Sequence, residues 1–206
     1  MKPPFAVLAA LFAGMLTAAP AAAFDDPDWP CQQRRVNNLS MGAMWTGPVP
    51  EDPEAWREDP ALADAVARIA ARRTPMHEVE AIIDQIAEGP DPAERLPMLY
   101  AGVFSLIDAE RARIVDGIVR YVQRQRGLAE QIDAEQVELA RLEAETAQDD
   151  FDGQDRIEEM RDKILWDVRI YEERRRSLMF VCESPVILEQ RAFAVARAVM
   201  ARLEAN

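Results

Sequence analysis

The chain of 206 residues carries 37 acidic and 24 basic side chains, a formal net charge of −13 at pH 7. A charge of this sign opposes binding to nucleic acid and to anionic membrane surfaces, so neither is an expected partner. The length suits one domain with an extension.

The first residues have the pattern of a secretory signal peptide. Lys2 precedes an apolar run over residues 5–19, and Ala21-Ala22-Ala23 follows as a small-residue cleavage site. We therefore predict a signal peptide over residues 1–23 and a periplasmic or secreted mature chain without membrane insertion. An uncleaved anchor is the alternative, but the apolar run is short for a bilayer span.

Residues 24–50 show no clean hydrophobic period and are predicted to form an irregular N-terminal arm over the rest of the fold. Trp29 and Trp45 are expected to anchor this arm by packing. Cys31 in the arm and Cys182 are the two cysteines of the chain. In an oxidising compartment such a pair favours a disulfide, here one that ties the arm to the beginning of the hairpin described below.

The opening of the arm resembles the start of an uncharacterised family of secreted bacterial helical proteins. The residues that carry the resemblance are Asp28-Trp29-Pro30-Cys31, Gln33-Arg34, Leu39-Ser40 and Trp45-x-Gly47-Pro48. The family brings no assigned activity. The resemblance therefore implies export and nothing about mechanism.

Capping side chains precede prolines at five places, a pattern typical of helix starts: Asp52-Pro53, Asp59-Pro60, Thr74-Pro75, Asp91-Pro92 and Ser184-Pro185. At Asp91 the following Glu94 completes a capping-box pattern. Apolar residues at helical spacing predict two short helices, one after Asp59 and one after Thr74. We expect a helical-bundle base formed by residues 51–120 with 184–206, and a kink or break at Ser184-Pro185.

Residues 121–183 are predicted to form a long antiparallel coiled-coil hairpin, so that the fold class is all-α. Apolar residues spaced alternately by four and three continue from Ile114 to Leu142, and a matching series follows a turn placed at residues 150–155. With the turn centred on Asp152, Leu139 is expected beside Ile164, Ile132 beside Tyr171 and Tyr121 beside Cys182. Protrusion of this hairpin is preferred over a compact bundle because residues 123–176 are heavily charged outside the seam.

No catalytic constellation emerges from the sequence. His77 is the only histidine, which excludes sites needing two imidazoles and leaves no convincing Ser-His-Asp triad. Glycine-rich phosphate loops are absent, and the many acids make any carboxylate pair uninformative. We therefore expect no enzyme and no cofactor.

The sequence contains two candidate ion sites. With Gly153 at the sixth position of a calcium loop, Asp150, Asp152 and Glu159 fall at ligand positions, but an acidic turn with a helix cap explains the same residues. Met41 and Met44, with Met76 and His77, could supply soft copper ligands, or the methionines could fill gaps in a core.

The seam has a polar interruption around Gln125 and Tyr171, followed by Arg174 and Arg175. It predicts either a docking site for a partner or a polar layer that fixes register. The hypothesis is a non-enzymatic extracytoplasmic interaction module (adaptor, assembly factor or chaperone-like) that presents a rigid stalk and an acidic tip around Phe151 and Asp152.

Two alternatives accompany this hypothesis. One is a carrier of a small ligand, copper or calcium, with a site lined by Trp29, Trp45, Met41 and Met44. The other concerns assembly, because a seam of this length could also join two chains as a homodimer through the stalk.

Overall fold

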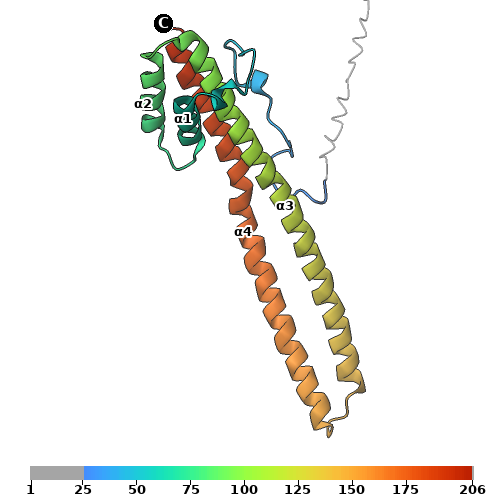
Figure 1. Cartoon of the computed structure of the whole chain (residues 1–206). Coiled ribbons are helices and arrows are strands. Elements are labelled where there is room, and N and C mark those ends of the chain that lie inside the picture. The colour runs from blue at the N-terminus through green and yellow to red at the C-terminus, as the bar shows by residue number, and fades with distance from the viewer. Residues whose placement is uncertain (1–25, 206) are drawn as a thin grey trace, which may run out of the picture.

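The computed structural model describes residues 26–205, so the predicted signal peptide lies outside the described residues. This part of the chain is all-α, as predicted. Two short 3-10 helices, η1 Met41–Ala43 and η2 Ala55–Arg57, precede α1 Pro60–Ala70, α2 Met76–Ala87, α3 Pro92–Glu145 and α4 Phe151–Leu203. α3 and α4 form one long hairpin, and α1 and α2 lie beside the end opposite its loop (Figure 1).

The base is a small bundle in which α1 and α2 cover the paired ends of α3 and α4. The side chains predicted to face inward from α1 and α2 are buried, among them Val66, Ile69, Val79 and Ile83. They pack with apolar residues of α3 up to Ile107 and of α4 from Leu188 onward. This burial of apolar surface is the main stabilising contribution to the base.

Gly102 of α3 lies directly against side chains of η2 and α1. A Cβ atom there would lie 2.8 Å from Cδ2 of Trp56 and 2.8 Å from Cγ2 of Val66. Only glycine therefore lets α3 pack directly against the indole ring of η2 and against α1.

The predicted helix caps differ in outcome. The Asp59 carboxylate accepts hydrogen bonds from the amides of Ala61 and Leu62, which confirms that cap. The capping box at Asp91 is wrong: Asp91 is left-handed, with φ 49°, and its side chain makes no cap bond. Its carbonyl oxygen instead accepts from the amides of Glu94 and Arg95. Aspartate is among the residues that tolerate this conformation.

α2 and α4 depart from prediction at their prolines. α2 begins at Met76 with Pro75 in the capping position, while the Thr74 hydroxyl donates to the carbonyl oxygen of Arg68. The expected break at Ser184-Pro185 is absent, since α4 continues through a buried Pro185. A proline inside a helix costs about 3 kcal/mol, but the disulfide before it and the core after it hold both sides of the helix.

α3 has 54 residues and α4 has 53, so each is about 80 Å long. Beyond the base the two helices continue side by side as a stalk (Figure 1), which we define as residues 121–183, and the N-terminal arm lies against its first turns. The predicted α3 seam is confirmed, since Ile118, Gln125 and Ile132 are buried and the residues between them on this face are half-buried.

The loop of the hairpin lies earlier than the predicted turn at 150–155. α3 ends at Glu145 and α4 begins at Phe151. The Asp150 carboxylate caps α4 by accepting from the amide of Gly153 at 3.0 Å. Gly153 is thus a helical residue, needed because a Cβ there would meet Thr146 and Asp150 at 2.4 and 2.5 Å.

The earlier loop moves the pairing of the two arms by one heptad. Gln125, not Ile132, lies beside Tyr171, and Tyr121 lies beside Arg174 rather than Cys182. A heptad seam presents the same apolar face after a shift of seven residues, so its pattern alone does not determine register.

No helix among residues 26–205 combines the length and the apolar character needed to cross a bilayer.

Candidate functional site

The N-terminal arm fastens the junction between base and stalk. Cys31 and Cys182 form the predicted disulfide, which joins residues 151 positions apart with Cα atoms separated by 5.5 Å. Further along the arm, the carbonyl oxygen of Val36 accepts from the buried guanidinium of Arg111 at 2.6 Å. The amide of Leu39 then donates to Asp108 at 2.6 Å. The arm therefore follows α3 from stalk to base.

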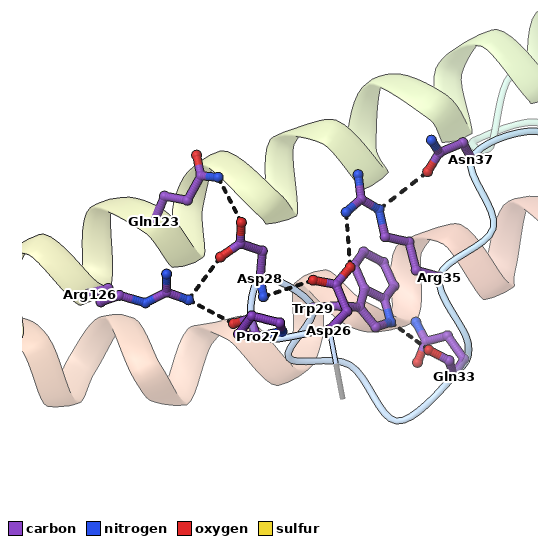
Figure 2. A network of polar contacts seen from close by, with 9 residues as sticks. All are labelled: Asp26, Pro27, Asp28, Trp29, Gln33, Arg35, Asn37, Gln123 and Arg126. Atoms are coloured by element: carbon purple, nitrogen blue, oxygen red, sulfur yellow. Dashed lines mark hydrogen bonds and ion pairs between the residues drawn. The ribbon is translucent and has the colours of Figure 1, made fainter. Parts of the chain in front are cut away.

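At its start the arm is bound to the stalk by charge (Figure 2). The Asp28 carboxylate lies between two side chains of α3: Gln123 donates to it at 3.0 Å and Arg126 at 2.8 Å. Arg126 also donates to the carbonyl oxygen of Pro27 at 2.9 Å. Hydrogen bonding by Gln123, followed by Arg126, lowers the pKa of Asp28 below its ordinary value, because both favour the carboxylate form.

Both tryptophans proposed as ligand anchors have structural partners. Trp45 is buried, stacks on Tyr100 with ring centroids 4.5 Å apart, and donates from Nε1 to the carbonyl oxygen of Pro48. Trp29 donates from Nε1 to the carbonyl oxygen of Gln33 at 2.6 Å. Met41 and Met44 are half-buried against the core, consistent with filling gaps there.

A hollow of about 540 Å³ lies beside the disulfide. It is lined by Cys31, Cys182, Met179 and Ile187, with glutamine and glutamate side chains at its edge. None of the four predicted ligand anchors lines it. This hollow is therefore not the carrier site that was expected to be lined by Trp29, Trp45, Met41 and Met44.

The residues proposed for calcium are not gathered into a loop. Asp150 caps α4, and Asp152 and Glu159 lie within the helix seven residues apart, about 10 Å along its axis. A calcium loop requires its ligands to converge from a non-helical segment. Within residues 26–205 no three potential acidic, histidine or cysteine ligands cluster around a common point.

The stalk tip is strongly acidic and has an exposed aromatic ring. Phe151, the first residue of α4, is 79% exposed, and Asp152 beside it is also exposed. Sixteen acidic and five basic residues occupy positions 130–173. The outer two thirds of the stalk, residues 130–173, therefore hold most of the net negative charge of the chain.

The polar interruption of the seam consists of side chains that bond to the opposite backbone. Nε2 of the buried Gln125 donates to the carbonyl oxygen of Tyr171 at 3.2 Å, and the Tyr121 hydroxyl donates to that of Arg174 at 2.9 Å. Arg174 and Arg175 have exposed side chains, and Arg175 pairs with Glu172 at 3.0 Å. This geometry matches the register-fixing layer, and leaves the arginines at the surface.

A second polar layer lies nearer the tip. Lys163 donates to Glu135 of α3 and, at 3.2 Å, to Asp167. Both carboxylates are 17% exposed, so Asp167 takes the seam position between Ile164 and Tyr171, and Val168 next to it is 36% exposed. Pairing with Lys163 makes the burial of two acids tolerable.

Sequence reasoning missed a row of apolar side chains on the solvent face of α4. Leu165, Trp166, Met179 and Phe180 are between 61 and 72% exposed. Large apolar side chains grouped on a solvent face are typical of interaction sites. The missed signal is that each pair directly follows a seam residue, Ile164 or Leu178, and so must point outward.

Comparisons with known proteins return no match for this chain, whether to protein-family models, to curated proteins or to solved structures.

Proposed function

We propose that this chain is a non-enzymatic protein-interaction module of an extracytoplasmic compartment, in which a disulfide-fastened base presents a rigid stalk to a protein partner. The observation that carries the proposal is the exposure of Phe151, Leu165, Trp166, Met179 and Phe180 along one helix. Burying these side chains against another protein would gain about 25 cal/mol for each Å² of apolar surface. The stalk is held straight by its seam, so little conformational entropy opposes binding.

The compartment is inferred from two features. A signal-peptide pattern opens the sequence, and the two cysteines of the chain form one disulfide. Stable structural disulfides persist in oxidising compartments. Within this proposal, adaptor, assembly factor and chaperone-like roles all use the same exposed surface.

Photocrosslinking in the native compartment tests the proposal. A photoreactive residue replaces Phe151, Trp166 or Phe180 in turn, and Val137, 73% exposed on α3, serves as the control position. We expect a discrete crosslinked protein from the α4 positions and none from Val137. Absence of crosslinks from all three α4 positions, at normal levels of folded protein, would contradict the proposal.

A further inference from the structure

The solvent face of α4 carries a regular series of residue pairs, which we name the outer stripe. Each pair directly follows one position of the seam heptad. Pairs that contain apolar or aromatic residues alternate with acidic pairs along the helix: Phe151-Asp152, Glu158-Glu159, Leu165-Trp166, Glu172-Glu173 and Met179-Phe180. Successive pairs are seven residues apart, about 10 Å, so all of them point the same way from the coiled coil.

The outer stripe is symmetric about its middle pair, Leu165-Trp166. The apolar groups at Phe151 and at Met179-Phe180 lie 14 residues, or about 21 Å, on either side of it. Glu158-Glu159 and Glu172-Glu173 lie seven residues on either side. If a second identical helix runs antiparallel against the stripe, acidic pairs meet acidic pairs, Leu165-Trp166 meets its own copy, and Phe151-Asp152 meets Met179-Phe180.

The charges beside the stripe are antisymmetric about the same point. Asp155 and Asp162 precede the middle pair, and Arg169 and Arg176 follow it at the same distances. All four side chains are exposed and lie between the pairs of the outer stripe on the same face of α4. Two-fold pairing would place Asp162 against Arg169 of the partner subunit and Asp155 against Arg176 of the partner subunit.

From this arrangement we propose that the outer stripe of α4 binds a second copy of this chain, antiparallel, with the two-fold axis at Leu165-Trp166. The proposal rests on the proposed function and names its partner. A two-fold interface must be self-complementary, so that opposite charges lie at equal distances from the axis. A foreign partner imposes no such condition on one helix. The spacing and the charge order of the stripe therefore favour a second copy.

The acidic pairs do not prevent this association. Glu173 already pairs with Arg169 at 3.2 Å, and Glu172 with Arg175 at 3.0 Å. Glu158 and Glu159 would therefore approach carboxylates that each have an arginine of their own helix beside them. The middle contact is apolar, with Leu165 against Trp166 of the partner subunit, and Phe151 meets Phe180 of the partner subunit at each end.

Sedimentation equilibrium of the disulfide-bonded mature chain is the test. We expect a monomer–dimer equilibrium that R169D weakens at least about tenfold, because each interface then opposes Asp162 to another aspartate twice. The double variant D162R/R169D inverts both charges and should restore dimerisation. The matched control is R113D, which removes an exposed arginine of α3 that also pairs within its helix, with Glu110 at 2.9 Å. It should leave the equilibrium unchanged.

A cysteine variant locates the axis. L165C should form an intermolecular disulfide under mild oxidation, whereas V137C on the exposed face of α3 should not. A chain that stays monomeric at the highest concentration it tolerates overturns the proposal. So does a dimer that R169D leaves unchanged, since its interface must then lie elsewhere. Crosslinks from Phe151 or Trp166 to a different protein would preserve the proposed function while refuting this choice of partner.

Discussion

The hydroxyl of Tyr121 donates a hydrogen bond of 2.9 Å to the carbonyl oxygen of Arg174, which lies 53 residues later in the chain. One turn further along α3, Gln125 makes the equivalent bond to the carbonyl oxygen of Tyr171. Both acceptors are backbone oxygen atoms, so neither bond depends on which side chain α4 carries at that position. Together they hold the two arms in one register at the level where the stalk leaves the base.

This register specifies a shortened stalk that should still fold. Removing residues 132–145 and 155–168 deletes two heptads from each arm, and keeps the loop, the Asp150 cap and Gly153 in place. We expect a lower helical signal in circular dichroism but one cooperative thermal transition, because the base core and the disulfide are untouched. Loss of cooperative unfolding would show that base and stalk are a single folding unit.

A deletion out of phase provides the control. Removing residues 132–145 with only 155–166 shifts the α4 seam by two residues against α3. Arg169 and Arg176 then take the seam positions of Ile157 and Ile164. This variant should melt at a lower temperature than the in-phase deletion although it retains two more residues.

Lys163 is predicted to hold the tip half of the stalk together in a pH-dependent way. Its hydrogen bond lowers the pKa of Glu135 below the ordinary value of 4.5, with a further contribution from Gln131. The folded-state pKa is depressed, so this stabilisation is present above pH 4.5 and is lost as the pH falls through the folded-state pKa. Lys163→Met should therefore lower the melting temperature at pH 7, and the difference from wild type should narrow at low pH.

The control for Lys163→Met is Arg141→Met. Arg141 pairs with Glu138 and Glu145 on its own helix, and its side chain is 52% exposed. Exposed pairs within one helix contribute little to stability. Thermal melts of both variants at several pH values should therefore separate them, and equal effects of the two substitutions would refute a special role for Lys163.

Gly102 and Gly127 on α3 should respond to alanine with opposite signs. At Gly102 the added methyl group overlaps Trp56 and Val66, an overpacking that should lower the free energy of unfolding by about 1–3 kcal/mol. At Gly127 nothing lies within 4 Å, so alanine should raise it by up to about 1 kcal/mol through helix propensity. Urea denaturation of the two variants measures both; a neutral Gly102→Ala would contradict the close approach of α3 to Trp56.

The sequence predicts those features that depend on composition and period. Leu62, Val66 and Ile69 face the core because apolar spacing of three and four allows no other helix face, and Cys31 had only Cys182 to join. The register of α3 against α4 could not be predicted, because a shift of seven residues leaves the apolar face of the seam unchanged. The loop was misplaced because Gly153 reads as a turn residue, whereas its missing Cβ serves close packing inside a helix.

The interaction surface was hidden for a related reason. Leu165 and Trp166 look like core residues in a sequence, and only the placement of Ile164 in the seam turns them outward. The reverse holds for two polar residues, Gln125 and Glu135, which look like gaps in the apolar series of the seam. The structure keeps both in the seam, because Gln125 donates to the carbonyl oxygen of Tyr171 and Glu135 accepts from Lys163. Periodicity identifies a face, and the partner helix decides what that face meets.

The disulfide between Cys31 and Cys182 joins residues 151 positions apart and so closes a long loop. Cys31→Ser with Cys182→Ser, or reduction of the wild type, should lower the melting temperature while helicity at 25 °C stays nearly unchanged. The chain-entropy model assigns up to about 5 kcal/mol to so long a loop. Nearer the base the arm keeps its contacts with Arg111 and Asp108 and the packing of Trp45. Without the disulfide, the arm should therefore loosen most at its start, where Asp28 binds Gln123 and Arg126. Hydrogen exchange should rise over residues 26–35 and not in the base helices.

Reductant added to the double variant is the control and should leave its melting temperature unchanged. Equal melting temperatures of oxidised and reduced wild type would mean that the arm is held by its other contacts alone.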